Sequence, residues 1–330
     1  MQAFYADHFV LPLPQGHRFP MQKYAMLRER LVSQMPAIEL HEALPVTAEE
    51  LGLVHTPEYI HAVFNGTLSP AAQREIGFPW SPGMAERACR SVGGTLGAAR
   101  AALKGGCIAA NLAGGTHHSH PDRGGGFCVF NDVAVAARQV QLDHAGMPVK
   151  SFNRALQVAV VDLDVHQGDG TARIFEKDDS VFTLSLHGAK NFPVRKQTSD
   201  CDIELPDGCQ DDAYLDALEQ GLSCLEQRFE PDLVFYLAGA DAHEGDRLGR
   251  LAVSDDGMES RDRRVFDWAF QRRVPLVMTM EGGYGHDIES TLRVQTNTYR
   301  VALQYWQRWQ TLTAGAFNPS MDANSPQPMK

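Results

Sequence analysis

The sequence predicts an α/β fold made of one domain in three layers, α/β/α, with a central, mainly parallel sheet. Two observations support this fold class. Short apolar runs, such as 158–161 and 274–280, are followed by glycine-containing turns and then by helix-like stretches along most of the chain. Parallel strands need long crossovers of this kind, which are usually helices. The runs are also continuously apolar, as in strands that are buried on both faces.

We expect one folded domain over residues 1–313. No linker, change of composition or fixed-period repeat interrupts it. Residues 314–330 contain three prolines and few apolar side chains, so they are predicted to form a disordered C-terminal tail.

The individual elements follow from local signals. The predicted strands are 3–5, 106–112, 158–161, 181–186, 232–238 and 274–280. Helices are predicted at 21–34, 47–53, from 56 onward, and at 84–103, 131–144, 170–177, 211–229, 256–273 and 287–309. Pro57 suits a first helical turn, and the acidic pair Asp211 and Asp212 favours another helix start through the helix dipole. The stretch 68–83, with its three prolines, is predicted to be a loop.

Composition and charge exclude several classes of function. The net charge is −11 and no basic face is visible, which argues against nucleic acid as a partner. An acidic surface could attract a cationic substrate, but acidity is too common to predict one. No apolar stretch approaches about 18 residues, so no membrane span is expected. Six scattered cysteines without a C-x-x-C pair, and no signal-peptide pattern, favour a cytoplasmic location.

Reactive side chains directly follow four of the predicted strands. They are the pair His117 and His118, the cluster 162–169, Asp241, and Tyr284. In parallel α/β sheets, ligands bind beyond the carboxyl ends of the strands. Four polar strand ends at one edge therefore predict a single site.

Asp162, Asp164 and His166 alternate after an apolar strand, so they face one side of the strand end. Buried carboxylates without a partner are costly, which favours a bound cation. Oxygen and nitrogen ligands suit zinc, iron or manganese. We predict Asp164, His166 and Asp241 as the ligands, since three protein ligands leave a position open for water or substrate. The alternative is an ordinary helix N-terminus after a strand.

The adjacent histidines can move protons if each ring is held in one orientation. A carboxylate on the far ring nitrogen does this, so we pair Asp162 with His117 and Asp169 with His118. Tyr284, between two glycines, is a protonated phenol that can donate to a developing oxyanion. The alternatives are two turn histidines and a tyrosine that packs on its own loop.

Together these groups fit hydrolysis of an amide. A metal polarises the carbonyl, and a histidine takes a proton from water and later protonates the leaving amine. Phe127 and Phe192, on loops that leave the same edge, are candidate walls of a narrow apolar channel, or else ordinary core aromatics. His120 is interpreted as a loop residue without a role.

These residues belong to motifs that stand at 114–118 (GGTHH), 126–128 (GFC), 131–132 (ND), 162–171 (DLDVHQGDGT), 185–187 (SLH), 239–241 (GAD) and 282–284 (GGY). In their order and spacing, over residues 4–303, they resemble the zinc-dependent histone deacetylases and their bacterial relatives. The run 244–249 and the compact length are similar to the class IV branch in particular.

The resemblance implies the arginase/deacetylase fold, one zinc ion per chain, and removal of acetyl or longer acyl groups from lysine side chains of a peptide or protein. It implies Asp164, His166 and Asp241 as zinc ligands, Tyr284 as the oxyanion donor, and His118 as the principal acid and base with His117 assisting. It also implies a structural potassium ion near Asp162, Asp164, His166, Ser185 and Leu186. The substrate channel would be lined by Gly126, Phe127, Phe192 and Gly283.

Three other functions stay open: hydrolysis of a small acylated amine such as an acetylpolyamine, a two-manganese hydrolase of the arginase type, and non-catalytic binding. Arginases need carboxylates where this chain has Gly168 and His243, which argues for one metal. Intact His117, His118 and Tyr284 argue against a binding protein. The short loop 66–83 favours an open mouth. The sequence does not predict the acyl length, the physiological substrate or the oligomeric state.

Overall fold

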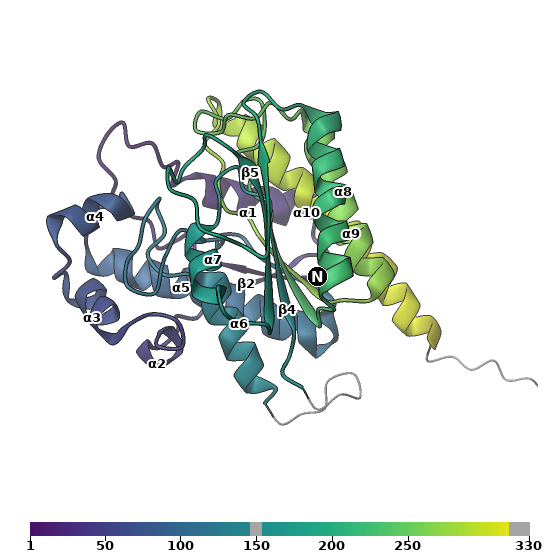
Figure 1. Ribbon diagram of the computed structural model, residues 1–330, viewed down its shortest axis with the longest axis horizontal. Helices are drawn as coiled ribbons and strands as arrows, with labels where there is room; N and C mark the ends of the chain where they lie inside the picture. The colour runs from purple at the N-terminus through teal and green to yellow at the C-terminus, as the bar shows by residue number, and fades with distance from the viewer. Residues whose placement is uncertain (146–153, 317–330) are drawn as a thin grey trace, which may run out of the picture.

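The computed structural model describes residues 1–145 and 154–316, which form one sheet with helices on both faces (Figure 1). The strands are β1 (Gln2–Tyr5), β2 (Glu39–Glu42), β3 (Ile108–Asn111), β4 (Val158–Asp162), β5 (Val181–Gly188), β6 (Cys201–Leu205), β7 (Leu233–Leu237) and β8 (Leu276–Thr279). They are hydrogen-bonded in the order β2-β1-β3-β8-β7-β4-β5-β6, and all neighbours are parallel. The predicted parallel α/β fold is confirmed.

Helices form the two outer layers. One face of the sheet carries α1 (Lys23–Gln34), α8 (Asp211–Arg228), α9 (Asp255–Arg272) and α10 (Ile288–Ala316) (Figure 1). The other face carries α5 (Pro82–Ala101), α6 (Asp132–Asp143) and α7 (Asp169–Phe175). The short helices α2 (Ala48–Leu51), α3 (Pro57–Asn65) and α4 (Pro70–Ile76) lie farther out on this second face, and a π-helical turn, η1 (Ala102–Gly106), follows α5.

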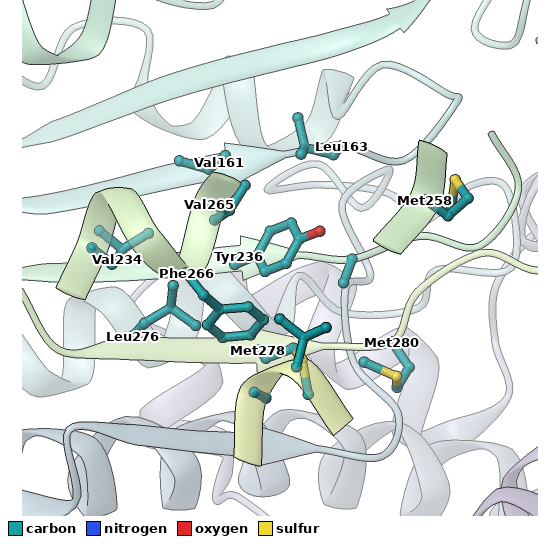
Figure 2. Packing of buried hydrophobic residues seen from close by; sticks show 14 of the residues in the cluster. Val161, Leu163, Val234, Tyr236, Met258, Val265, Phe266, Leu276, Met278 and Met280 are labelled. Atoms are coloured by element: carbon teal, nitrogen blue, oxygen red, sulfur yellow. The ribbon is translucent and has the colours of Figure 1, made fainter. Parts of the chain in front are cut away.

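Both faces of the sheet are buried, which explains the continuously apolar strands. In β4, Val158 and Val160 belong to the core beneath α5 and α6, whereas Ala159 and Val161 belong to the core beneath α8 and α9. Figure 2 shows Phe266 of α9 beside Leu276 and Met278 of β8 in the core on the side of α8 and α9. A charge in the middle of such a strand would reach water on neither face. In the four central strands, the one charged residue is Asp162, at the very end of β4.

Several elements differ from the sequence prediction. Residues 70–76, expected in a loop, form α4, whose first turn is capped because the Ser69 hydroxyl accepts from the amide of Ala72 (3.2 Å). Strands β2 and β6 were not predicted, because short edge strands with partly exposed side chains lack a continuous apolar run. Helix α10 continues to Ala316 and so includes the first residues of the predicted tail. The rest of that tail, 317–330, lies outside the described residues.

Two further findings bear on where the chain can reside. Within residues 1–145 and 154–316, none of the helices has the length and apolar character that crossing a membrane requires. All six cysteines are unpaired thiols.

His55 joins the segment before α3 to the loop that follows the histidine pair. Its Nδ1 donates to the carbonyl oxygen of His120 (3.0 Å), and its Nε2 accepts from the amide of Asn131 (3.0 Å). Burial lowers the pKa of His55 to about 4, since a proton on Nε2 would place an unpaired charge in the interior and remove the acceptor for Asn131. The neutral ring is therefore part of the fold.

We expect acid to destabilise the protein through His55. The pKa is about 4 in the folded chain and 6.5 in its unperturbed form, so the unfolded chain takes up the proton first. Stability therefore falls as the pH drops below 6.5 and levels off below about 4. Between pH 7 and pH 5 the loss is about 2 kcal/mol, at about 1.4 kcal/mol per pKa unit. Urea unfolding at both pH values measures this loss, and His55→Gln is the control without a titrating ring. Equal losses in the two proteins would contradict the prediction.

Candidate active site

The three predicted metal ligands lie together at the carboxyl ends of two neighbouring strands. Asp164 and His166 follow β4, and Asp241 follows β7, which pairs with β4. The Nδ1 atom of His166 lies 2.9 Å from Oδ1 of Asp164 and 3.2 Å from Oδ2 of Asp241. One nitrogen and two carboxylate oxygens thus lie within 4.8 Å of one another.

The surroundings of these ligands fit a bound cation. The amide of Val165 donates to Oδ1 of Asp241 (3.0 Å), and the amide of Gly282 donates to Oδ2 of Asp164 (3.1 Å). The other oxygen of Asp241, Oδ2, is buried and has no hydrogen-bond partner among the described residues. Burial and the Asp164 carboxylate raise the pKa of Asp241 to about 7, which indicates uncompensated negative charge. A divalent cation would compensate it, and this donor set suits zinc.

Both predicted histidine–carboxylate pairs are formed. Nδ1 of His117 is 2.7 Å from Oδ2 of Asp162, and Nδ1 of His118 is 2.7 Å from Oδ1 of Asp169. The Nε2 atoms of the two histidines are 3.2 Å apart. The second oxygen of Asp169 is 3.0 Å from Nε2 of His120, a bond that the sequence interpretation missed. Each carboxylate therefore fixes the orientation of at least one imidazole ring.

The two adjacent histidines differ in protonation. Burial by itself would lower the pKa of His117, but attraction to Asp162 outweighs it and raises the pKa to about 9. Burial, together with the charge of His117, lowers the pKa of His118 to about 4. At neutral pH, His117 is charged and His118 is neutral. With Nδ1 of His118 donating to Asp169, its Nε2 carries the lone pair that a proton acceptor needs.

Tyr284 is held in place through its backbone. Its amide donates to Oδ2 of Asp246 (2.6 Å), and its carbonyl oxygen accepts from Nε of Arg247 (2.8 Å). Burial and the nearby Asp164 carboxylate raise the pKa of Tyr284 well above its ordinary value of 10. The phenol therefore stays protonated and can donate a hydrogen bond.

A cavity of about 910 Å³ leads from the surface to these groups. We call it the entrance cavity; its inner wall contains His118, His166, Asp169 and Tyr284. The predicted channel aromatics both line it. The ring of Phe192 stands edge-on to that of His118, with centres 4.8 Å apart, and the ring of Phe127 is 5.9 Å from that of Tyr284. An apolar passage therefore ends at the histidine and the tyrosine.

The two glycines that were predicted in the channel have different surroundings. Gly126 lies against His118, because a side-chain carbon at this position would be 2.5 Å from Cδ2 of the ring. Gly283 has a φ of 149°, which favours glycine, and a carbon there would meet Thr291 of α10 at 2.6 Å. Gly282, not Gly283, lines a smaller cavity next to Tyr284. Gly283 thus shapes the turn rather than the channel wall.

The residues predicted around potassium lie at the end of β4 and in the neighbouring part of β5. Asp162 pairs in register with Ser185, and Oδ1 of Asp162 accepts from the amide of Asp164 (3.1 Å). The next residue, Leu186, is buried, and His166 is bonded to Asp164. The hydroxyl of Ser185 is bonded to Nδ1 of His187 (2.9 Å).

Two more buried charged side chains border the site and were not predicted. Nζ of Lys23 donates to the carbonyl oxygen of Glu281 (2.8 Å) and lies 5.4 Å from the centre of the Tyr284 ring. The carboxylate oxygens of Glu281 have no hydrogen-bond partner in the described structure, and Oε1 lies 3.8 Å from Nδ1 of His117. Burial and the charge of Asp162 raise the pKa of Glu281 well above its ordinary value, which favours its protonated form. Glu281 directly follows an apolar strand, and this position could have indicated that it belongs to the site. Lys23 lies in an amphipathic helix, where a lysine is expected to be exposed.

The positions that distinguish arginases do not supply a second set of ligands. A side-chain carbon at Gly168 would be 2.3 Å from Oδ2 of Asp162, which leaves no room for a carboxylate. His243 is directed to α9, where its Nε2 is 3.3 Å from Oδ1 of Asp255. The described residues hold one other group of potential ligands, consisting of His117, Asp162 and Glu281. The first two of these are bonded to each other (2.7 Å).

Comparison with known proteins agrees with this geometry. The histone deacetylase domain matches residues 17–299. An uncharacterized protein of Picosynechococcus sp. is 44% identical over 301 residues, which are 90% of this chain and 97% of that protein. Histone deacetylase 2 of Arabidopsis thaliana is 31% identical over 297 residues, covering 84% of this chain and 71% of that protein. The crystal structure of an HDAC homolog complexed with SAHA has a TM-score of 0.76 at 23% identity, with 98% and 92% of the two chains covered.

The fold and the site are those of a hydrolase built at the carboxyl edge of a parallel sheet. The chain belongs to the histone deacetylase family. The resemblance that the motifs indicated is thereby confirmed.

We expect Gly126→Ala to lower hydrolysis of an acylated amine at least about tenfold. The added carbon would lie 2.5 Å from the His118 ring, and a shift of about 1 Å near reacting groups can cost about a hundredfold. Gly125→Ala is the matched control, since its nearest atoms lie 3.8 and 4.0 Å away. Values of kcat/KM measure the effect, and melting temperatures show that both variants fold. Equal activity of the two variants would rule out contact with His118 as the reason for this glycine.

Proposed function

We propose that this protein is a zinc-dependent amidohydrolase that removes acetyl or longer acyl groups from lysine side chains. One observation carries the proposal: a group of three candidate metal ligands includes His166, which lines the inner end of one cavity together with the neutral His118 and the protonated Tyr284. Amide hydrolysis needs an electrophile, a base and a donor to the oxyanion. Membership of the histone deacetylase family supports the same class of reaction.

Asp164, His166 and Asp241 would hold one zinc ion per chain. When bound there, zinc supplies Lewis-acid polarisation of the acyl carbonyl and makes water a better nucleophile near neutral pH. Three protein ligands are typical of catalytic sites, which keep a position open, and not of closed structural sites. His166 lines the entrance cavity, so the ligand set is accessible to a substrate.

His118 acts as the general base and then as the general acid. It is neutral, it lines the entrance cavity, and its bond to Asp169 directs Nε2 away from the carboxylate. Nε2 takes the proton of the attacking water and passes it to the leaving lysine amine. His117 is already charged and bonded to Asp162. Its positive charge keeps His118 neutral and stabilises the negative charge that develops in the transition state.

Tyr284 donates a hydrogen bond from its hydroxyl group to the oxyanion as the carbonyl carbon becomes tetrahedral, and it keeps its proton. Phe127 and Phe192 enclose the methylene chain of the acylated lysine, and the absence of a side chain at Gly126 leaves space beside His118. An apolar passage of this kind suits an uncharged acyl-lysine and rejects a charged, deacylated one.

We also propose a structural potassium ion beside Asp162, Asp164, His166, Ser185 and Leu186. The Asp162 carboxylate, at the buried end of β4, lies in register with Ser185 inside β5, and hard cations prefer oxygen ligands such as these. A cytoplasmic location is supported by the six free thiols, which an oxidising compartment would tend to pair.

Purified protein loaded with zinc is expected to hydrolyse acetyl-lysine or longer acyl-lysine peptides and to lose this activity on chelation. Tyr284→Phe removes one hydroxyl and should lower kcat about 10²- to 10³-fold, the usual cost of losing an oxyanion donor. Release of the free amine measures the rate, with acetylpolyamines assayed in parallel. Elemental analysis should find one zinc ion per chain.

Three outcomes would contradict the proposal in different ways. Two manganese ions per chain, with no zinc-dependent turnover, would indicate a hydrolase of the arginase type. Turnover of acetylpolyamines alone would assign the site to small molecules. Bound zinc without turnover of any acylated amine would indicate a binding protein.

We expect His120 to act as a positioning residue for Asp169. His120→Leu removes the donor to Oδ2, so the carboxylate can rotate and its pKa, which His118 and His120 hold low, should rise. We expect kcat to fall about tenfold, the effect of losing one hydrogen bond to a charged group. The acid limb of the pH–rate profile should move upward. His120→Gln can place an amide donor at the same oxygen and should restore both. A leucine variant with slower turnover but an unchanged acid limb would indicate a purely structural role.

A further inference from the structure

The charge at the rim of the entrance cavity is opposite in sign to that of the whole chain. The net charge of the protein is −11. Yet five exposed cationic side chains line this cavity, and they come from segments far apart in the sequence: Arg18, Arg74, Arg123, Lys190 and Arg250. Because these segments surround one opening, the cations act together on whatever enters it.

The carboxylates around the rim are fewer than the cations. Lys190 and Arg250 share one partner, Asp207, at 3.6 and 3.0 Å. Arg123 pairs with Asp122 at 3.3 Å. Among the residues that the structure describes, neither Arg18 nor Arg74 forms an ion pair. Two exposed cations at the mouth are therefore available to a ligand.

The two acidic residues of the cavity wall do not change this balance. Asp169 is buried at the inner end, where it is bonded to His118 and His120. Glu75 is exposed beside Arg74 and is the one carboxylate of the cavity wall at the rim itself. The rim therefore carries five cations and three carboxylates. Glu75 lines the cavity, whereas Asp122 and Asp207 are ion-pair partners of the cations and do not line it.

The loop at 190–196 adds a positive charge and apolar contacts near the rim. It reads KNFPVRK and has no acidic residue. Arg195 is exposed, as Lys190 is, whereas Lys196 is half-buried and donates to the carbonyl oxygens of Asn191 and Pro193 (2.6 and 2.7 Å). Phe192 is 47% exposed and Val194 is 96% exposed, so both are accessible to a ligand that lies across the mouth. An extended chain that reached the cavity would meet positive charge and apolar side chains together.

We propose that the acyl-lysine substrate lies in an acidic segment, with aspartate or glutamate close to the acylated residue on a peptide or protein. This inference rests on the proposed function and specifies its substrate class. The acyl-lysine enters between Phe127 and Phe192, while the flanking carboxylates meet Arg18, Arg74 and their neighbours at the rim. Acetylpolyamines, and acyl-lysines among lysines and arginines, carry positive charge that this rim repels.

The negative charge of the proposed substrate lies on the residues beside the acyl-lysine and not on the acyl group. All five cations are exposed at the outer part of the cavity, whereas its inner end approaches the carboxylates of Asp164 and Asp241. An acid at the end of the acyl chain would be carried past the arginines and toward those carboxylates.

Three peptides of equal length with the same central acetyl-lysine test the inference on the zinc-loaded protein. Their flanks are acidic, neutral or basic. We expect kcat/KM to fall in that order, by about three- to thirtyfold from the acidic to the neutral peptide. Each exposed ion pair contributes up to about fivefold, and two rim arginines are unpaired. The preference should largely disappear at about 0.5 M salt, where exposed charges are screened.

A double variant, Arg18→Glu with Arg74→Glu, should remove or reverse the preference while the neutral peptide is still hydrolysed. The matched control is Arg263→Glu with Arg300→Glu, which changes the net charge equally on the exposed sides of α9 and α10. The control should keep the order of the three peptides.

Equal rates for all flanks, or a basic preference, would overturn the inference and leave the proposed function intact if the neutral peptide is turned over. A faster reaction with a neutral-flanked succinyl-lysine peptide than with the acidic acetyl-lysine peptide would also overturn it, because the anion would then belong to the acyl group. Hydrolysis of none of the peptides would overturn both proposals.

Discussion

Burying an ionised carboxylate is costly unless a positive group or a proton compensates it, and the carboxyl edge of this sheet buries Asp162, Asp164, Asp169, Asp241 and Glu281. Charged His117 compensates Asp162, His118 and His120 are bonded to Asp169, and burial raises the pKa of Glu281, which favours its protonated form. The remaining two carboxylates have only His166 between them. The balance of the buried negative charge thus accounts for three features: the position of Asp164 and Asp241 around His166, the orientation of each imidazole ring, and the neutrality of His118.

The side chains at the entrance have the opposite charge to those around the ligand cluster. Carboxylates dominate around the ligand cluster, while arginines and a lysine dominate the rim. Between them lie Phe127 and Phe192, which are apolar. Under the two proposals made for this protein, such a layered arrangement would separate two tasks: the rim would select the surroundings of the acylated lysine, the aromatic passage would admit only its uncharged form, and the interior would perform the chemistry. Specificity and catalysis would then rest on different residues, which could change independently.

Much of the fold and of the candidate site could be predicted from the sequence, because the carboxyl ends of parallel strands lie at one edge of the sheet. The carboxylates and histidines after apolar runs predicted the candidate ligands that lie together and both histidine–carboxylate pairs, and the motifs indicated the family. Some elements were missed: α4 starts at Pro70 after the N-cap Ser69, but it lies in a stretch with three prolines that was interpreted as a loop, and β2 and β6 are short edge strands. The bond from His120 to Asp169, and the burial of Lys23 and Glu281, depend on contacts across 49 and 258 positions of the chain, which no local pattern contains.

The strand order has a consequence for how the protein is made. β7 and β8 lie at the centre of the sheet between β3 and β4, although they leave the ribosome last. Before they are synthesised, β2-β1-β3 and β4-β5-β6 are two separate half-sheets with unpaired inner edges. Asp164 and His166 are synthesised before Asp241, and Tyr284 is synthesised after all three. A chain that ends before β7 lacks both Asp241 and Tyr284, so under the proposed function it would have neither the complete ligand set nor the oxyanion donor.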